Sequence, residues 1–534
     1  MIGSRGAGGR GAGEAGEAGE ARENFYPVPS SQSPIPNPQS PIPNPQSPVP
    51  SPQSPIPSPQ SPMTNPIEVR NPRTGKFDYV IIPPPPRLLA QQCNRARRAQ
   101  TRWYQLGVEG RIAALQEWKQ AILSERQQLT EALVNDTGRL SISILEIDSF
   151  LASIDRWCDL APDLLQESAK NTSIPFIALQ QTSVPYSLVG VISPWNFPLL
   201  LSMIDTIPAL LAGCAVIVKP SEIAPRFVAP LLIALNNVPN LRDVLIFLEG
   251  AGETGAALID YVDVICFTGS VVTGRKVAEA AAKRFIPAFL ELGGKDPAIV
   301  LESADLDLAT SAILWGAVVN TGQSCLSIER IYVAESIFEE FYHQLIAKAH
   351  RLQLAYPNVE SGQIGPIIAE KQAEIIKNHL TDAVDKGAVI HCGGKVEELG
   401  GGWWCRPTVL TQVNHSMKVM TEETFGPIMP VMPFPSVEEA VYLANDAIYG
   451  LSAAVFAGSE EEALPVARQI QAGAISINDA ALTAIMYEGE KNAFKFSGLG
   501  GSRMGAAALK RFMRKQAFLI KTNSAHDPWW FDHG

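Results

Sequence analysis

The sequence contains few residues of the kinds that build disulfide frameworks or metal centres. Its 534 residues include seven cysteines, an odd and widely spaced set without a Cys-x-x-Cys pair. Neither a disulfide framework nor a zinc cluster is therefore expected. All seven histidines follow Cys325, the nearest being His343, and none has a ligand-like spacing such as HExxH. We predict no metal, and the cysteine usage fits a reducing cytoplasm.

An excess of positive charge and a long apolar run are also missing. The chain has 54 acidic and 43 basic residues, a net charge of −11, which gives no electrostatic reason to expect nucleic acid or an anionic membrane as partner. The most apolar region, residues 186–218, is interrupted by prolines, Asn196 and Asp205, so it falls short of the roughly 20 apolar residues that span a bilayer. The N-terminus lacks the apolar segment of a secretion signal. We expect a cytoplasmic protein that acts on small molecules.

Proline is concentrated near the N-terminus. From Gln32 the pattern Gln-Ser-Pro-Ile-Pro-Asn-Pro recurs with period seven, and such a composition favours extended polyproline backbone without a packed face. We expect residues 1–62 to be a disordered extension. Its role is either that of a PxxP-type ligand or that of a spacer or translated repeat upstream of the real start. We expect the start at Met63, and an intact mass of the native protein that includes the extension would contradict this.

Beyond Pro66 the pattern predicts an α/β protein, and 46% hydrophobic residues suffice for a large core and more than one domain. Residues 87–136 predict two amphipathic helices, with apolar positions three or four apart. Short apolar strands with helical stretches between them then predict a parallel, doubly wound sheet. These strands are expected at 189–193, 215–219, 245–248, 264–268 and 298–301.

Polar residues follow several of these strands, where ligands of open α/β sheets collect. The prolines of Ser193-Pro-Trp-Asn-Phe-Pro198 fix Asn196 in a rigid turn, although a plain turn asparagine also fits. Lys219 and Glu222 could bind sugar hydroxyls or form a solvated surface pair. The strand, turn and helix start around Cys266-Phe-Thr-Gly-Ser270 present free backbone N–H groups to an anion such as pyrophosphate.

Two further residues are candidates for the chemical steps. Glu291 lies between Leu290 and Leu292, where partial burial disfavours its charged form and suits a general base; a salt-bridged glutamate is the alternative. Cys325 follows a glycine turn, and a single cysteine is more often a buried thiol than a nucleophile. A nucleophile needs an oxyanion donor and a base, and Asn196 and Glu291 supply these roles.

In this order the motifs resemble the aldehyde dehydrogenase superfamily, in its NAD-dependent, hydrolytic form, from about Glu68 to the C-terminus. The spacing of Glu291 and Cys325 is that of the family's general base and nucleophile. The matching segments are Pro-Trp-Asn-Phe-Pro at 194–198, Lys-Pro-Ser-Glu at 219–222, Phe-Thr-Gly-Ser at 267–270, Glu-Leu-Gly-Gly-Lys at 291–295, Gly-Gln-Ser-Cys at 322–325 and Glu-Thr-Phe-Gly-Pro at 423–427.

The resemblance implies a Rossmann-type dinucleotide-binding domain, an α/β catalytic domain and a small β oligomerisation arm. We expect the cofactor domain mainly in 63–290, the catalytic domain in 291–475, and a return to the cofactor domain, with a C-terminal oligomerisation strand, in 476–534. The arm would pair residues 173–186 with 517–521. Because an exposed strand edge favours pairing with another chain, a homodimer or homotetramer is expected.

The resemblance also implies the mechanism. Cys325 attacks the aldehyde, the Asn196 amide and the Cys325 N–H stabilise the oxyanion, and Glu291 activates the water that hydrolyses the thioester. NAD is the implied cofactor, since Glu222 would repel the 2′-phosphate of NADP. The implied cofactor-binding residues are Trp195, Lys219, Ser221, Glu222, Gly269, Ser270, Glu423 and Phe425, of which Lys219 and Glu222 bind the adenosine ribose, Glu423 the nicotinamide ribose, and Phe425 packs near the nicotinamide.

The chain departs from the family at two charged positions. Asp205 stands where many members have a lysine, and Arg503 near a glutamate, so we predict that an Asp205–Arg503 pair replaces the usual one and alters the route by which protons leave. An unchanged pH–rate profile in Asp205→Asn would contradict this. The stretch 480–492 is longer than expected and predicts a reshaped substrate mouth.

The expected substrate is an apolar or aromatic aldehyde rather than succinic semialdehyde. Ser324 and Leu326 flank the nucleophile, Trp195 and Met203 are expected in the tunnel, and no arginine pair adjoins Cys325 in sequence. Two alternatives are a CoA-acylating relative and a catalytically silent binding protein of the same fold. The first usually lacks a residue like Glu291, and the second is expected to lose the nucleophile or the base.

Overall fold

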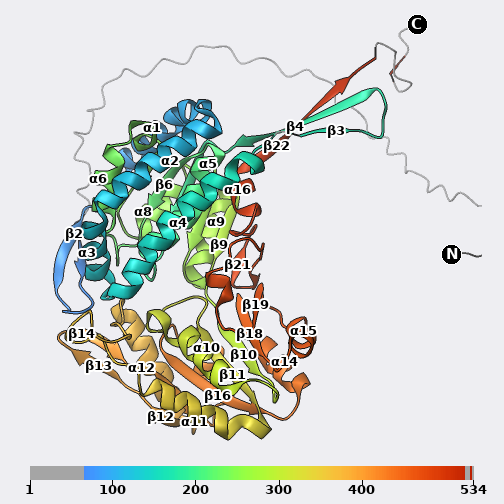
Figure 1. Cartoon of the computed structure of the whole chain (residues 1–534). Helices are drawn as coiled ribbons and strands as arrows, with labels where there is room; N and C mark the ends of the chain where they lie inside the picture. The colour runs from blue at the N-terminus through green and yellow to red at the C-terminus, as the bar shows by residue number, and fades with distance from the viewer. Residues whose placement is uncertain (1–64, 167, 524–529, 532–534) are drawn as a thin grey trace, which may run out of the picture. The chain divides into compact units, whose positions relative to one another are not determined.

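The computed structural model describes residues 65–166, 168–523 and 530–531, so the extension expected at 1–62 lies outside the described residues. Two open sheets with flanking helices, and a narrow three-stranded arm, make up this part of the chain (Figure 1). The predicted α/β class is confirmed. No helix within the described ranges is long and apolar enough to cross a membrane.

The first sheet has six strands in the order β21-β9-β8-β5-β6-β7, all parallel except β21. Every residue of β5, β6 and β8 is buried, as expected of strands covered on both faces. From β5 the chain runs to β6 and β7 on one side and then returns to β8 on the other. This reversal of strand order lies between β5 and β8, and sheets of this kind bind ligands beyond the carboxyl ends of the strands at such a point. The strands are β5 Leu188–Ile192, β6 Ala215–Lys219, β7 Leu245–Phe247, β8 Val264–Thr268, β9 Ala288–Glu291 and β21 Gly498–Leu499.

The N-terminal helices of this part pack against the first sheet, and α1 contacts β5, β6 and β7. The prediction of two helices over 87–136 was wrong, because three are present. Gly107, where the first two helices meet, adopts a left-handed φ of 71°, a conformation that costs glycine little. The spacing of apolar positions continues across this junction, so the spacing did not indicate that one helix ends and another begins. The helices are α1 Pro86–Gln105, α2 Gly107–Ser124, α3 Arg126–Thr137, α4 Leu140–Leu164, α5 Pro198–Ala212, α6 Val228–Asn236, α7 Pro239–Arg242, α8 Gly252–Ile259, α9 Val271–Arg284 and α16 Ala507–Lys510.

The second sheet has seven strands in the order β12-β15-β16-β11-β10-β18-β19. The prediction that the strand near 298–301 extends the first sheet was wrong, since β10 pairs with β11 and β18. The apolar sequence of a strand does not indicate which sheet the strand joins. The strands are β10 Asp296–Val300, β11 Ile328–Ala334, β12 Val389–Cys392, β15 Thr408–Thr411, β16 Ile428–Phe434, β18 Ser452–Phe456 and β19 Ala474–Ile477, with helices α10 Leu306–Val318, α11 Phe338–Ala349, α12 Glu370–Asp385, α13 Lys418–Thr421, α14 Val437–Asn445 and α15 Glu460–Ala467.

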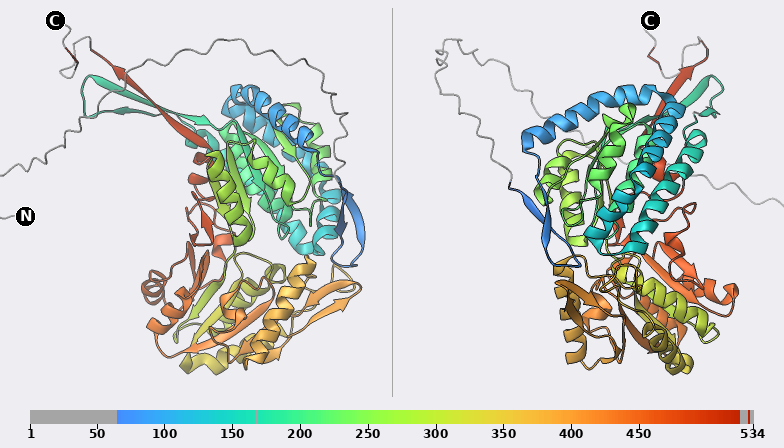
Figure 2. Two further views of the ribbon diagram at one scale, coloured as in Figure 1. Left: turned by 180° about the vertical axis from the view of Figure 1, so that it is seen from behind. Right: turned by 60° about the vertical axis from the view of Figure 1, so that its left-hand side comes forward.

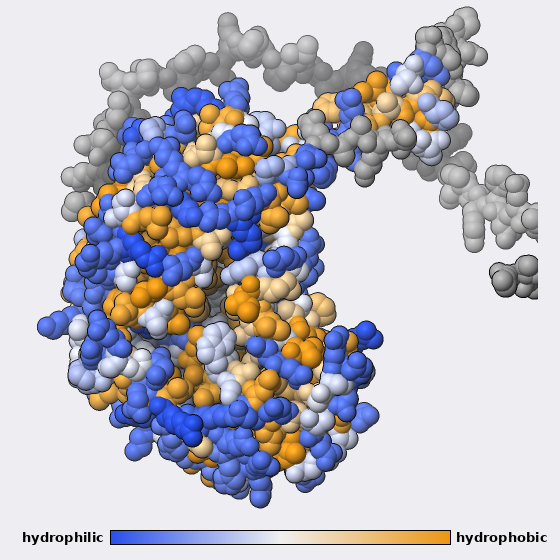
Figure 3. All heavy atoms as spheres, viewed as in Figure 1, coloured by the Kyte–Doolittle hydropathy of each residue, from blue (hydrophilic) through white to orange (hydrophobic). Residues whose placement is uncertain are grey.

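The arm projects from the rest of the described fold (Figures 1 and 2). It consists of β3 Ser168–Asn171, β4 Ile177–Pro185 and β22 Met513–Lys521, and β4 pairs antiparallel with β22 along its whole length, which confirms the predicted pairing. Its outer part exposes apolar side chains (Figure 3), with Phe518 46%, Leu519 73% and Ile520 41% exposed. Two-stranded ribbons complete the fold: β1 Ile67–Arg70 with β2 Phe77–Ile81, β13 Val396–Leu399 with β14 Gly402–Cys405, and β17 Tyr449–Gly450 with β20 Phe494–Lys495.

Candidate active site

The rigid turn after β5 places Asn196 against the loop that carries Cys325. Asn196 is buried, and its side-chain Nδ2 donates a hydrogen bond to the backbone carbonyl of Gln323, 3.1 Å away. Its own backbone carbonyl accepts from Arg139 Nη2 at 2.9 Å and from Asn320 Nδ2 at 3.0 Å. These bonds fix both the position and the direction of the Asn196 side-chain amide. It lies against Gln323, which is two residues before Cys325 in the chain.

A buried ion pair behind this turn was missed by the sequence analysis. Glu146 of α4 accepts hydrogen bonds from the backbone N–H groups of Leu199 and Leu200, both at 3.2 Å. A carboxylate in this place satisfies free donors at the start of α5 and interacts favourably with its dipole. Arg139 lies 3.8 Å from Glu146. Burial raises the pKa of Glu146 to about 7, against the effect of Arg139.

The cysteine loop follows a left-handed turn, the 3-10 helix η1 Val319–Gly322. Asn320, Thr321 and Gly322 have φ values of 57°, 58° and 71°. At Gly322 a Cβ would lie 2.2 Å from the backbone of Gly426, so only glycine fits there. The side chain of Gln323 then donates to two backbone carbonyls and accepts from the N–H of Ile368 at 2.9 Å. These bonds hold the loop in one conformation, and sequence reasoning had assigned Gln323 no role.

Cys325 differs from the other cysteines in its surroundings. All seven lie within the described ranges, and Cys325 alone is not buried. Its backbone N–H makes no hydrogen bond to any described residue and is available to an oxyanion. Burial of the sulfur raises the pKa of the Cys325 thiol to about 12, an effect that Lys491 opposes. Although its sulfur is largely enclosed, Cys325 borders a cavity. A thiol that serves only to fill the core would not border one.

That cavity has a volume of about 290 Å³ and also receives Glu291. Ser324 and Leu326 line it as expected, and residues 481–491 form part of its wall. The expectation for Met203 was wrong, because this side chain is buried in the core of the first sheet, and Trp195 is not among the lining residues. The apolar lining comes mainly from Leu145, Trp157, Leu200, Ile204, Trp315 and Leu451, and the charged lining comprises Glu146, Arg156, Glu291, Lys491 and Arg503.

Glu291 ends β9 and faces a buried cluster of charges. Its carboxylate Oε1 lies 3.8 Å from Arg503 Nε, and its side chain is 19% exposed. Arg503 Nη2 donates to Asp205 Oδ2 and to Thr268 Oγ1, both at 2.8 Å, which confirms the predicted Asp205–Arg503 pair. Arg511 donates to the other oxygen of Asp205. Although burial opposes ionisation, the two guanidinium groups hold the pKa of Asp205 below its usual range.

The predicted adenosine-side residues gather beyond the carboxyl ends of β6 and β8. Lys219 Nζ lies 2.9 Å from Glu222 Oε2, and the neighbouring Ser221 is buried. The N–H of Gly269 donates to the carbonyl of Glu291 at 3.1 Å. Ser270 caps α9 by accepting from the N–H of Thr273. The start of a helix offers further N–H groups that an anion can accept from.

The predicted nicotinamide-side residues come from the loop 423–425. Glu423 Oε1 accepts from the N–H of Gly294 at 3.1 Å, and burial with the nearby Glu329 raises the pKa of Glu423 to about 8. Glu329, which sequence reasoning missed, accepts from the N–H groups of Thr424 and Phe425, both at 2.7 Å. Trp195 packs edge-on against the Phe425 ring at a centroid distance of 5.5 Å.

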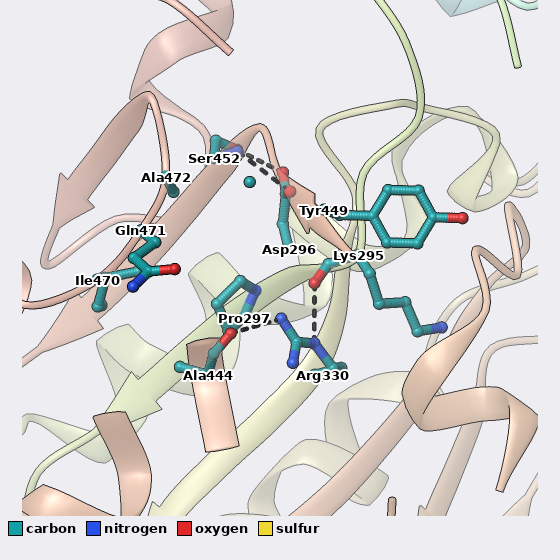
Figure 4. A pocket seen from close by; sticks show the side chains of 11 residues that line it. Lys295, Asp296, Pro297, Arg330, Ala444, Tyr449, Ser452, Ile470, Gln471 and Ala472 are labelled. Carbon is teal, nitrogen blue, oxygen red and sulfur yellow. Dashed lines mark hydrogen bonds between the residues drawn. The ribbon is translucent and has the colours of Figure 1, made fainter. Parts of the chain in front are cut away.

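A polar layer lies where β10 begins, directly after Glu291-Leu-Gly-Gly (Figure 4). Ser452 donates to Asp296 from its N–H and its hydroxyl, and Arg330 donates to the carbonyls of Lys295 and Ala444 at 2.8 and 2.9 Å. The small space between them measures about 10 Å³, about enough for one water molecule. This layer therefore supports the glycine segment and binds no substrate.

Comparisons with known proteins agree with this geometry. The model of the aldehyde dehydrogenase family matches residues 60–518. The 4,4′-diapolycopene aldehyde oxidase of Methylomonas sp is 38% identical over 457 residues, which cover 84% of each chain. Among solved structures, that named Putative Aldehyde Dehydrogenase PutA from Anabaena variabilis is 87% identical, with a TM-score of 0.87 over 88% of this chain and 100% of that one. Betaine aldehyde dehydrogenase from Staphylococcus aureus in complex with NAD+ is 30% identical, with a TM-score of 0.81 over 87% of this chain and 93% of that one.

Proposed function

The chain belongs to the aldehyde dehydrogenase family, and we propose that it oxidises an aldehyde to the carboxylic acid with NAD, through a thioester on Cys325. The observation that carries this proposal is the shared cavity of Cys325 and Glu291, with the Asn196 amide bonded to the cysteine loop. A nucleophile, a base and an oxyanion donor thus come together from three separate parts of the sequence.

In the first half of the reaction, the Cys325 thiolate attacks the carbonyl carbon of the aldehyde and forms a thiohemiacetal. The negative charge that develops on the aldehyde oxygen is stabilised by Asn196 Nδ2 and by the free N–H of Cys325. Bound NAD supplies the acceptor for the hydride that leaves the thiohemiacetal carbon. Cys325 then carries the acyl group as a thioester.

In the second half, Glu291 takes a proton from a water molecule in the cavity, and the water oxygen attacks the thioester carbon. The bond from carbon to sulfur breaks, the acid is released and the Cys325 sulfur leaves as thiolate. The same two oxyanion donors serve this tetrahedral intermediate. Water, hydride acceptor and aldehyde account for every atom and electron in the overall reaction.

The carboxyl ends of β5 and β8 are the place that we propose for the dinucleotide. The start of α9 would bind phosphate through its N–H groups, Lys219 and Glu222 would bind the hydroxyls of one ribose, and Glu423 would bind the second ribose. Close approach of the backbone to Glu423 depends on Gly293, where a Cβ would lie 2.4 Å from Glu423 Oε2. Because Glu222 adds a negative charge beside Lys219, we propose NAD rather than NADP as the cofactor.

The cavity supports an extended or bulky apolar aldehyde as substrate. Its lining is largely aliphatic and aromatic, and a hydrophobic pocket of this kind discriminates weakly between chain lengths, by about 1 to 3 kcal/mol per methylene. The Methylomonas relative is named for the aldehyde of a polyene, which agrees with an apolar substrate. Arg156 and Lys491 nevertheless line the same cavity, so a polar group on the substrate is compatible with the site.

We further propose that the two sheets correspond to the cofactor-binding domain, mainly 63–290, and the catalytic domain, 291–475, with 476–534 returning to the first.

We also propose that the arm takes part in a homodimer or homotetramer. Its apolar end is exposed, and its strand edges and Leu519 are open to another chain. The CoA-acylating and silent alternatives are disfavoured by the presence of Glu291 and by the accessibility of Cys325.

The test is NADH formation, followed by absorbance, with aliphatic aldehydes of increasing length, an aromatic aldehyde and succinic semialdehyde. We expect turnover with apolar aldehydes that is lost in Cys325→Ala, while the matched variant Cys266→Ala, which changes a buried cysteine of β8, stays active. Turnover that requires CoA would favour the acylating alternative. NAD binding without turnover across the panel would favour the silent one.

A further inference from the structure

Four charged side chains lie close together beside the cavity. Asp205 lies between two guanidinium groups, those of Arg503 and Arg511. These three side chains are 1%, 8% and 5% exposed, so they are enclosed by the protein. The carboxylate of Glu291 lies 3.8 Å from Arg503 Nε. Arg503 is therefore within ion-pair distance of two carboxylates, those of Asp205 and Glu291.

Arg503 is oriented so that its Nε–H has no partner on the side of Glu291. Its Nη2 is occupied by Asp205 Oδ2 and Thr268 Oγ1, both at 2.8 Å, whereas its buried Nε makes no hydrogen bond to any described residue. Glu291 Oε1 lies 3.8 Å from this unsatisfied donor. That separation exceeds a hydrogen bond, but it is closed by a small rotation of the glutamate or bridged by one water.

We propose that Arg503 is a positioning residue for Glu291, whose carboxylate it orients for activation of the hydrolytic water. This inference rests on the proposed role of Glu291 as the general base. Asp205 contributes indirectly by holding Arg503 in place.

Other charged groups also lie near Glu291, besides Arg503. Cys325, Lys491, Arg156 and Glu146 line the same cavity from other elements, and the carboxylate of Glu423 packs against the backbone at Gly293, two residues further along the chain. The partners of β9 in the sheet, β8 and β21, bring no charged side chain to its paired positions. Arg503 is therefore the cation within ion-pair distance of Glu291 in the described part of the chain.

The experiment compares the rate of thioester hydrolysis in wild type, Arg503→Met and Arg503→Lys, with Arg511→Met as the matched control. Arg511 binds the same Asp205 but forms no ion pair with Glu291. Hydrolysis is followed as kcat in the steady state, and acylation as the burst of NADH in the first turnover.

We expect Arg503→Met to lower kcat, by up to the factor of about 10² to 10⁴ that a positioned general base contributes, because Glu291 is no longer held toward the water. The burst should persist, Arg503→Lys should restore most of the wild-type kcat, and Arg511→Met should leave kcat nearly unchanged. A kcat that stays the same in Arg503→Met, or that falls equally in Arg511→Met, overturns the proposal.

Two additions keep the outcome decisive. If Arg503→Met fails to fold because Asp205 loses a partner, the double variant Asp205→Asn/Arg503→Met removes the cation together with its carboxylate, and the same loss of kcat is expected. Glu291→Gln tests the underlying function, since a burst without further turnover supports its role as base. Unchanged turnover in Glu291→Gln would remove that role, whereas a blocked Glu291→Gln with an unchanged kcat in Arg503→Met would refute only the role of Arg503.

Discussion

Replacing Asn196 by alanine removes one of the two hydrogen-bond donors that the site offers to an oxyanion. The structure allows the effect on the reaction rate to be estimated separately from the effect on folding stability. The donor lost is Nδ2, which in the resting enzyme binds the Gln323 carbonyl at 3.1 Å. The backbone of the turn keeps its own anchors, because Arg139 and Asn320 donate to the main-chain carbonyl of Asn196, which alanine retains.

The structural cost is small. The Gln323 carbonyl still accepts from Asn320 Nδ2 at 2.9 Å, so no buried acceptor is left unsatisfied, and the loss of one hydrogen bond amounts to about 1 kcal/mol of folding free energy. The catalytic cost is larger. Removal of one oxyanion donor typically lowers kcat by about 10² to 10³, or roughly 3 to 4 kcal/mol in the transition state, and the N–H of Cys325 remains as the second donor.

The assay is the rate of the first-turnover NADH burst, measured by stopped flow together with the melting temperature. We expect Asn196→Ala to slow the burst by about two to three orders of magnitude with little change in melting temperature. Asn320→Gly is the control, because it removes the other donor to the same carbonyl and tolerates the left-handed φ of 57°. A burst in Asn196→Ala within tenfold of wild type, or an equal loss in Asn320→Gly, would refute the assignment of Asn196 as oxyanion donor.

Three further predictions concern neighbouring parts of the molecule. Lys491→Met should raise the pKa of the Cys325 thiol further above its value of about 12 in the free enzyme, so the thiolate fraction at a given pH falls and alkylation of Cys325 by iodoacetamide slows; an unchanged rate between pH 8 and 10 would contradict this. Glu222→Gln should narrow the preference for NAD over NADP in kcat/KM by removing the charge beside Lys219, and a preference that stays the same would show that Glu222 does not face the 2′ position. Leu519→Asp, at a position 73% exposed on the arm, should lower the molar mass seen by light scattering, whereas the same mass as wild type would exclude this part of the arm from an interface.

The residues predicted from the sequence are those at strand ends, where an apolar run followed by a turn marks the position. The bounds of β6 and β8 agree with the predicted strands 215–219 and 264–268, because every residue in them is apolar until the last. By the same signal the sequence identified the segments that carry Asn196, Lys219 and Gly269. A local pattern suffices there since parallel strands bring their carboxyl ends to one edge of the sheet.

Residues that act from a distance were not predictable in this way. Glu146 reaches the start of α5 from the middle of an amphipathic helix, and Glu329 binds the backbone of the 423–425 loop from a strand in the second sheet. Neither position differs locally from an ordinary buried residue. The error at Met203 has a simpler cause, because Leu200 and Ile204 share one face of α5 at a spacing of four and line the cavity, while Met203 lies on the face that packs into the core.

The ionisation of Cys325 and of Glu423 depends on such distant residues more than on the motif that carries each group. The pKa of the Cys325 thiol responds to burial and to Lys491, and that of Glu423 to burial and to Glu329. Neither Lys491 nor Glu329 lies in the motif of the group that it affects. Two chains with identical motifs can therefore differ in the pH range over which they act.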